Sequence, residues 1–249
     1  MKKLILFASA LCMSVCAMAQ SEFYVYKKDG SSVQFTIADV DSISFTAPAT
    51  GTGTANGHEW VDLGLPSGTK WATCNVGATK PEEYGNYYAW GETETKTTYN
   101  WSTYKWCNGS AETQTKYCTN SDYGTVDNKT VLDLEDDAAR ANWGGAWRMP
   151  TDAEWTELRE NCTWTWTTKN GVNGYEVKSK TNGNSIFLPA AGYRDGFDSY
   201  YAGYYGYYWS SSLRAGNPDD AWGVYFGSDD VIRRSDGRCC GQSVRPVLK

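Results

Sequence analysis

Aromatic side chains are the feature that most constrains how this chain can fold. The sequence has 12 Trp, 18 Tyr and 7 Phe, and large rings allow a chain with few Leu and Ile to bury a core. Runs of helix-favouring residues are scarce, whereas Gly, Thr, Ser and Asn are abundant. This composition favours short strands joined by many loops over a helical bundle. The length of 249 residues fits one large domain or two small ones.

The first residues have the pattern of a secretory signal. Two lysines precede an apolar run from Leu4 to Val15, and Ala17-Met18-Ala19 is a small-residue cleavage site. The apolar run is too short to span a bilayer. We therefore expect residues 1–19 to be removed and the mature chain, without a transmembrane segment, to be secreted or held at the cell surface. Lipid attachment at Cys16 is the less favoured alternative, because Val15 stands where a small residue is normally needed.

The remaining cysteines and the net charge limit which kinds of metal site, cofactor and partner are expected. Six cysteines follow the signal, and an even number permits disulfides in an exported protein. Cys107 and Cys118 are close enough in sequence to close a loop. The chain has no C-x-x-C pair with a His partner, so we expect neither structural zinc nor a cofactor. The net charge of −6 and the lack of a basic stripe argue against a nucleic-acid partner.

Composition divides the mature chain into three parts. Residues 20–47 predict a small N-terminal β-hairpin segment, with strands at 23–27 and 32–37 and a third short strand at 42–45. A hairpin of this size is not stable alone, so we expect it to dock on the main domain or on a neighbouring chain. Residues 48–57 have the composition of a flexible linker. The main domain is then expected at 58–249.

The main domain is expected to be α+β, with short strands, two helices and long loops. A helix is predicted over 134–142, ending at Gly144-Gly145. A second helix begins after Thr151, which forms a capping box with Glu154. Two strands flank a turn at Pro66-Ser67-Gly68. Further strands are predicted at 163–168, 174–180 and 184–193, the last as a central strand, and at 243–249 as a closing strand.

Residues 194–240 form a block of unusual composition. Its 47 residues include seven Tyr, seven Gly, seven Asp, six Ser and five Arg. The block has no Lys, Glu, Gln or Met, although these four types occur 32 times in residues 1–192. Replacing the two adenines of an AAC or AAT codon reaches none of those four types, and it reaches every type present in the block except Trp, whose two copies, Trp209 and Trp222, are interpreted as framework. We therefore interpret the block as adenine-targeted diversification; ordinary drift in a low-complexity loop is the alternative.

Several motifs in combination resemble one known family. The stretches LEDDAARANWGGAWRMPTDAEWTEL, AAGYR, YWSSS, AW and SVRPV look like the Fibrobacter succinogenes major paralogous domain, which is common in exported proteins of gut Bacteroidetes. The resemblance covers roughly residues 58–249. It implies a C-type-lectin-like fold, similar to that of formylglycine-generating enzymes. It also implies a variable protein of a diversity-generating retroelement, in which a constant frame displays diversified side chains.

The resemblance separates frame positions from diversified positions. The implied frame comprises Tyr193, Trp209, Ser210, Ser211, Trp222, Phe226, Val244, Arg245 and Pro246. The implied diversified, ligand-binding positions are Phe197, Asp198, Tyr200, Tyr201, Tyr204, Tyr205, Tyr207, Arg214, Asp219, Asp220, Tyr225, Ser228, Asp230, Ile232, Arg233, Arg234, Asp236 and Arg238. Tyrosine offers a large amphipathic contact area, and Ser, Gly and Asp add adaptable hydrogen bonding, as in antibody paratopes. We expect a receptor or adhesin for a protein or cell-surface ligand, with a glycan also possible.

Other functions are weighed against this expectation. A fixed carbohydrate-binding module of the same fold is the first alternative, with Trp164 and Trp166 as sugar-stacking candidates, although core packing is the favoured role of both. A formylglycine-type oxidase using Cys239-Cys240 is the second. The lone His58 has no convincing triad partners, so no catalytic residues are assigned. Four carboxylates are calcium candidates, but acids near a helix N-terminus are the commoner explanation; they are Asp133, Glu135, Asp136 and Asp137.

Overall fold

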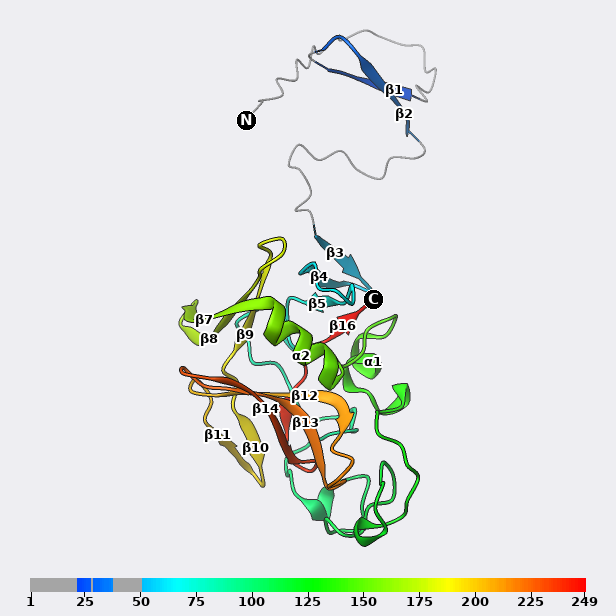
Figure 1. Cartoon of the computed structure of the whole chain (residues 1–249), viewed down its shortest axis with the longest axis vertical. Coiled ribbons are helices and arrows are strands. Elements are labelled where there is room, and N and C mark those ends of the chain that lie inside the picture. Colours follow the sequence, from blue (N-terminus) through cyan, green and yellow to red (C-terminus); the bar gives the residue numbers. More distant parts are fainter. Residues whose placement is uncertain (1–21, 28, 38–50) are drawn as a thin grey trace. The chain divides into compact units, whose positions relative to one another are not determined.

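The computed structural model describes residues 22–27, 29–37 and 51–249, and the chain divides into two units, Met1–Thr50 and Gly51–Lys249 (Figure 1). In the first unit, β1 (Glu22–Tyr26) pairs antiparallel with β2 (Ser32–Thr36). Both strands agree with the predicted ones to within one residue at each end. The predicted signal and the third strand at 42–45 lie outside the described residues.

The second unit is a strand-rich α+β domain with two α-helices. One sheet joins the two ends of this unit, in the order β16 (Val247–Leu248), β5 (Lys70–Ala72), β4 (His58–Asp62), β3 (Thr52–Ala55). A second sheet has five strands, in the order β14 (Val231–Gly237), β13 (Asp220–Phe226), β12 (Gly206–Leu213), β15 (Gln242–Ser243), β6 (Tyr87–Tyr88). The third has the order β7 (Cys162–Lys169), β8 (Val172–Ser179), β9 (Ser185–Pro189). A short hairpin of β10 (Tyr193–Asp195) and β11 (Asp198–Tyr200) completes the strands.

Both helices are positioned by side-chain caps. The capping box of α2 (Asp152–Asn161) is confirmed, since Thr151 accepts from the Glu154 amide and Glu154 accepts from the Thr151 amide. The start predicted for the first helix is wrong: residues 134–136 form a 3-10 turn, and α1 (Ala138–Trp143) begins only after Asp137. The Asp137 carboxylate accepts from the Arg140 amide at 3.0 Å, so this side chain sets the helix N-terminus.

Three predicted boundaries need correction. The linker predicted at 48–57 overlaps β3, which pairs along its length with β4. The strand predicted as central, β9, lies at one edge of its sheet, and its apolar run is buried although only β8 pairs with it. The closing strand is divided between two sheets, as β15 and β16, because Arg245 and Pro246 separate them. In each case, contacts with distant segments decide the outcome.

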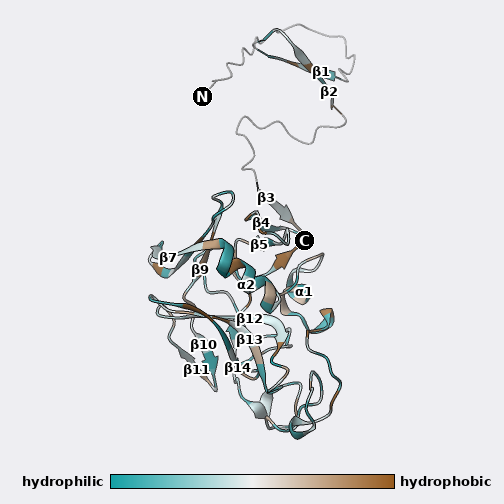
Figure 2. Cartoon of the chain, viewed as in Figure 1, coloured by the Kyte–Doolittle hydropathy of each residue, from teal (hydrophilic) through white to brown (hydrophobic). Residues whose placement is uncertain are grey.

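The core is largely aromatic, as the composition predicts. Among the described residues, five tryptophans have 0–1 % exposure: Trp71, Trp90, Trp147, Trp155 and Trp209. One buried cluster packs α2 against β8, β9, β12 and β13, and another surrounds Trp90, Trp147 and Trp209. Figure 2 shows the contrast between the apolar β16 and the hydrophilic β10. No helix among the described residues is long and apolar enough to cross a membrane.

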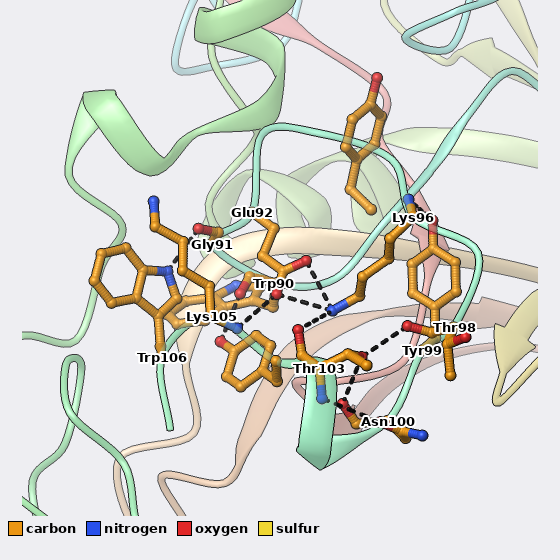
Figure 3. Close-up of polar contacts among 12 residues, drawn as sticks. Trp90, Gly91, Glu92, Lys96, Thr98, Tyr99, Asn100, Thr103, Lys105 and Trp106 are labelled. Atoms are coloured by element: carbon orange, nitrogen blue, oxygen red, sulfur yellow. Dashed lines mark hydrogen bonds and ion pairs between the residues drawn. The ribbon is translucent and has the colours of Figure 1, made fainter. Parts of the chain in front are cut away.

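Side chains order the loop-rich stretch that follows β6. Glu92 accepts from the Lys96 ammonium at 2.9 Å and from the Lys105 amide at 2.8 Å, and both contacts are drawn in Figure 3. The Trp106 indole donates to the Gly91 carbonyl at 2.7 Å. Asn100 caps the short 3-10 turn Trp101–Thr103. These hydrogen bonds give partners to polar backbone groups of an irregular segment, which packs against the C-terminal block.

Candidate functional site

Six tyrosines of the C-terminal region form one connected cluster at the surface. The Tyr193 ring lies 4.8 Å from Tyr207 and 5.4 Å from Tyr200, measured between centroids. Tyr207 continues to Tyr225 at 5.0 Å, and Tyr225 to Tyr205 at 5.4 Å. The circuit closes through Tyr201, which lies 5.2 Å from Tyr205 and 6.2 Å from Tyr193. We call these six residues the tyrosine cluster.

The strand register explains why the rings gather. Tyr193 of β10 is directly opposite Tyr200 of β11, and Tyr207 of β12 is opposite Tyr225 of β13. Directly opposed side chains lie on the same face of a sheet. The β10–β11 hairpin lies beside the five-stranded sheet in Figure 1, and the ring contacts join the two. We call this surface, made of β10–β11, residues 201–205 and the adjoining side of β12–β14, the tyrosine face.

Most of the predicted ligand-binding positions lie at the surface. Ten are exposed: Phe197, Asp198, Tyr200, Tyr201, Tyr204, Ser228, Asp230, Ile232, Arg233 and Arg234. Six are half-buried: Tyr205, Arg214, Asp219, Asp220, Tyr225 and Asp236. Phe197 and Tyr204 retain 73 % and 71 % exposure, which is unusual for large rings. A concentration of exposed aromatic side chains of this kind marks an interaction surface more often than an inert one.

Arg238 is not a surface residue, so its predicted role in ligand contact is corrected. Its side chain has 0 % exposure, and the guanidinium donates to the carbonyls of Lys116, Tyr117 and Pro218 and to the Tyr104 hydroxyl. It also lies 4.9 Å over the Trp90 ring. Arg238 therefore belongs to the core that supports the face.

Tyr207 is also buried, so its predicted role in ligand contact is corrected as well. Only 6 % of it is exposed, and its ring is covered by Tyr193, Tyr225 and the Arg234 guanidinium, which lies 5.4 Å from the ring centroid. Burial raises the pKa of its hydroxyl above the usual range. Tyr207 therefore lies beneath the more exposed rings of the cluster and supports them. A ligand would reach Tyr207 only after its neighbours moved.

Three other predicted positions gather around Trp222, on the opposite side of the sheet. Arg233 stacks 3.3 Å over the Trp222 ring and donates to Asp152 at the start of α2. Arg214 pairs with Asp220 at 2.8 Å beside the same ring. Because side chains alternate along a strand, Trp222 points to the α2 side and Tyr225 to the tyrosine face. The structure therefore does not bring all predicted positions onto one face.

The residues implied as frame are mostly interior. Trp209, Ser210, Ser211, Phe226, Val244, Arg245 and Pro246 are buried, whereas Tyr193 and Trp222 are half-buried. Arg245 donates to Asn75 and to the carbonyls of Ala72, Thr73 and Phe187, which fixes the C-terminal segment to two distant ones, residues 72–75 and β9. The Trp209 indole donates to the Tyr88 carbonyl. Buried, satisfied polar groups of this kind stabilise one backbone arrangement.

Sequence reasoning missed two members of the face. Tyr193 was placed in the frame, but it joins the tyrosine cluster through three ring contacts. Asp195 was not singled out, although it is exposed directly opposite Asp198 on the hairpin. The tight spacing of the two aspartates around Gly196-Phe197 was the available signal, since such a spacing predicts a hairpin turn.

The calcium candidates already have a cation. Oxygens of Asp133, Glu135 and Asp136 lie within 4.8 Å of one another, and the Lys116 ammonium is 2.8, 3.4 and 2.6 Å from these three carboxylates. Asp137, the fourth candidate, caps α1 and accepts from the Met149 amide. The Lys116 ammonium therefore stands where a metal ion would have to bind.

The remaining candidate residues, two tryptophans, the histidine and the cysteines, pack against other side chains or are free thiols. Trp164 and Trp166 pack on Tyr175 and Phe226, so their favoured role in core packing is confirmed. His58 stacks on Trp143 with centroids 3.8 Å apart, and burial lowers its pKa. The six cysteines among the described residues are free thiols in the structure, so the Cys107–Cys118 disulfide allowed by the sequence is not formed there.

Comparisons of the chain with protein-family models, with curated proteins and with solved structures gave no match. The residues and their geometry therefore carry the functional interpretation. They define a strand-rich α+β domain with an exposed aromatic face on a buried polar and aromatic frame.

Proposed function

We propose that the protein is an exported ligand-binding receptor or adhesin whose tyrosine face is diversified by a retroelement. The main domain would then be a C-type-lectin-like member of the Fibrobacter succinogenes major paralogous domain family, secreted or held at the cell surface. The ligand would be a protein or another cell-surface molecule. The strand-rich α+β architecture agrees with this proposal at the level of fold class.

One observation carries the proposal: side chains of the 194–240 block surround a cluster of exposed rings, and the sheet beneath them is fixed by buried residues such as Trp209, Phe226 and Arg245. Within the second unit, five of the eight exposed large hydrophobic residues come from 194–240: Phe197, Tyr200, Tyr201, Tyr204 and Ile232. The other three are Val126, Val131 and Leu134. A stable sheet that displays replaceable side chains is what a diversified binding protein requires.

The chemistry of the face suits contact with a macromolecule. Tyrosine loses few rotamers on binding and supplies both ring area and a hydroxyl. Tyr and Arg are also the residues whose truncation most often costs ~2 kcal/mol or more at an interface. The tyrosine face offers exposed Tyr200, Tyr201 and Tyr204 together with Arg234. These side chains would form the centre of the contact, with Asp198 and Asp230 at its margin.

Cys240 supports a non-catalytic reading of the cysteine pair. A cysteine nucleophile needs a lowered thiol pKa. The contact with Cys239, together with burial, raises the pKa of the Cys240 thiol far above its ordinary value. Cys239 itself is buried. This environment disfavours the thiolate that an oxidase of the formylglycine type would need.

Sequencing the gene in sister strains tests the proposal. We expect substitutions confined to 194–240, at codons derived from adenine-containing templates, with the buried Trp209, Phe226 and Arg238 unchanged. A reverse-transcriptase gene and a near-copy of the 3′ end should lie nearby. Substitutions scattered evenly along the chain would instead indicate a fixed module, such as a carbohydrate-binding one, and would remove the retroelement from the account.

A further inference from the structure

The charges of the tyrosine face are not balanced. Four aspartates are exposed along it and its adjoining turn: Asp195, Asp198, Asp229 and Asp230. In the part of the chain that the structure describes, none of the four forms an ion pair. Two of them accept hydrogen bonds from neutral groups: the Tyr200 hydroxyl is 3.4 Å from Asp198, and the Ser228 hydroxyl is 3.0 Å from Asp229.

The arginines of the same block already interact with groups of the protein itself. Arg214 pairs with Asp220, Arg233 with Asp152, and Arg234 with Asp236, each at 2.8–2.9 Å. Arg238 is buried in the core, and half-buried Arg194 donates to the Phe197 carbonyl. The block has no lysine. The accessible charge left on the face is therefore negative.

The position of Asp195 and Asp198 is costly in the free protein. These residues are directly opposite each other across the β10–β11 ladder, and like charges at opposed positions destabilise an antiparallel pair. No cation from the described residues relieves the repulsion by an ion pair. A bound cation between the two carboxylates would turn this repulsion into attraction.

The tyrosine cluster already accommodates one cation of the protein itself. The Arg234 guanidinium lies 5.4 Å from the Tyr207 centroid and 5.3 Å from that of Tyr225, within the range of cation–π attraction. Tyr200 and Tyr201 present the same kind of ring with no protein cation over it among the described residues, and both are exposed. A ligand cation placed there would repeat a contact that the fold already uses.

Carboxylates stand at both ends of the cluster. At one end, Asp195 and Asp198 lie on the strands that carry Tyr193 and Tyr200. At the other, Gly227 separates the Tyr205 ring from Asp230: a Cβ on this glycine would meet the ring at 2.9 Å and an Asp230 oxygen at 3.7 Å. Aromatic rings between two carboxylate positions fit an extended basic segment.

We infer that the tyrosine face binds a basic protein segment, whose lysine or arginine side chains pair with Asp195, Asp198 and Asp230 and lay their stems on the tyrosine rings. This inference rests on the proposed function and names the chemistry of its ligand. Electrostatic complementarity of this type steers encounter and selects among partners. Exposed carboxylates add little stability to the free protein, so their contribution would come from pairing with such a partner.

A random dodecapeptide library displayed on phage, panned against the full chain at low ionic strength, supplies the probe. We expect the enriched peptides to be rich in Lys and Arg. The best peptide, made synthetically, should bind the Asp195→Asn/Asp198→Asn variant about five- to twentyfold more weakly, the factor that two exposed charge pairs contribute. Its affinity for wild type should fall steeply with added salt, and its affinity for the variant, which keeps Asp230, should fall less steeply.

Two further variants make the test discriminating. Asp122→Asn removes an exposed aspartate outside the face and should leave peptide affinity unchanged. The Asn pair relieves the opposed charges, so its melting temperature should be at least that of wild type, and weaker binding would not reflect unfolding. Tyr201→Ala reports whether a peptide uses the tyrosine face at all, since this exposed ring contacts Tyr193 and Tyr205.

The outcomes separate the two proposals. Neutral or acidic peptides that lose affinity in Tyr201→Ala would overturn the basic ligand and leave the proposed function standing. Peptides that bind every variant equally would contradict both proposals. If no peptide is enriched, or if basic peptides ignore the Asn pair, the inference of a basic partner is wrong.

Discussion

Arg234 and Arg238 lie four residues apart in one compositionally uniform block, yet they belong to different parts of the molecule. Arg234 is exposed on β14 and pairs with Asp236 at the edge of the tyrosine cluster. Arg238 is fully buried, and its guanidinium is bonded to three carbonyls and a hydroxyl from distant segments. The block therefore contains both an exchangeable surface and part of the frame, and burial separates them where composition does not.

The same contrast appears between neighbours on β13. Phe226 is fully buried against Tyr208 and Tyr175, whereas Tyr225 is half-buried and belongs to the tyrosine cluster. If the surface is diversified and the frame is not, stability should reside almost entirely in the frame residues. Substitutions at matched pairs can break or sharpen this division.

The largest effect is expected for Arg238→Ala. It leaves three buried carbonyls and the Tyr104 hydroxyl without their donor, so unfolding should become easier by about 5 kcal/mol, the upper end for breaking a buried charged network. Urea denaturation of the purified full chain measures the change. Arg234→Ala, its matched control, should cost about 1 kcal/mol or less, because the Arg234 side chain is exposed and Asp236 keeps the hydrogen bond from Gln242. Equal losses in the two variants would erase the distinction.

Phe226→Ala comes next. Removing a fully buried ring should cost about 4 kcal/mol, from lost burial and the cavity that remains. Tyr225→Ala, one residue earlier, should cost about 1 kcal/mol because its ring is half-exposed. Thermal unfolding followed by near-ultraviolet circular dichroism reports both. A costlier change at Tyr225 would mean that the face, and not the frame, holds the sheet together.

Glu154 gives the frame a pH dependence. The Arg148 guanidinium, the Thr151 amide and the Thr69 hydroxyl outweigh desolvation and lower its pKa from 4.5 to about 2. A depressed carboxyl pKa stabilises the fold above the unfolded value, so about 3 kcal/mol should be present near pH 6 and lost between pH 4.5 and 2. Glu154→Gln should remove this part of the pH profile in urea titrations. Glu160→Gln, at an exposed position of the same helix, should retain it.

The smallest effects are expected on the face itself. Tyr204→Ser and Phe197→Ser replace rings that are 71 % and 73 % exposed. Surface substitutions of this kind usually change stability by less than about 0.5 kcal/mol. Differential scanning calorimetry should therefore show melting temperatures close to wild type. A clear drop for either variant would indicate that the exposed rings have a structural role.

Local signals were readable from the sequence, and long-range contacts were not. The capping box at Thr151 and Glu154 depends on residues three apart, so it could be predicted. The start of α1 could not be predicted. The composition of Leu134–Asp136 is as favourable to a helix as that of the residues after it, yet these three residues form a 3-10 turn and Asp137 caps the helix. Likewise, β9 has a central-strand sequence but gains its burial from packing and not from strands on both sides.

The site shows the same limit. The unusual composition of residues 194–240 pointed to the site, and the structure places most of the predicted ligand-binding positions at the surface. Burial of Arg238 depends on carbonyls at positions 116, 117 and 218, which no local pattern connects to it. The tyrosine cluster depends on strand register, so the positions of Tyr193 and Asp195 on the face follow from the β10–β11 pairing and not from the local sequence.

The most direct test of the account is a library in which Phe197, Tyr200, Tyr201, Tyr204, Ile232 and Arg234 are randomised together, displayed on cells and sorted for protease resistance. If the frame alone carries the fold, most variants should resist protease as well as wild type while their binding properties diverge. A matched library at Trp209, Phe226 and Arg238 should lose resistance in nearly all members. Comparable losses in the two libraries would contradict a stable frame that displays an exchangeable face.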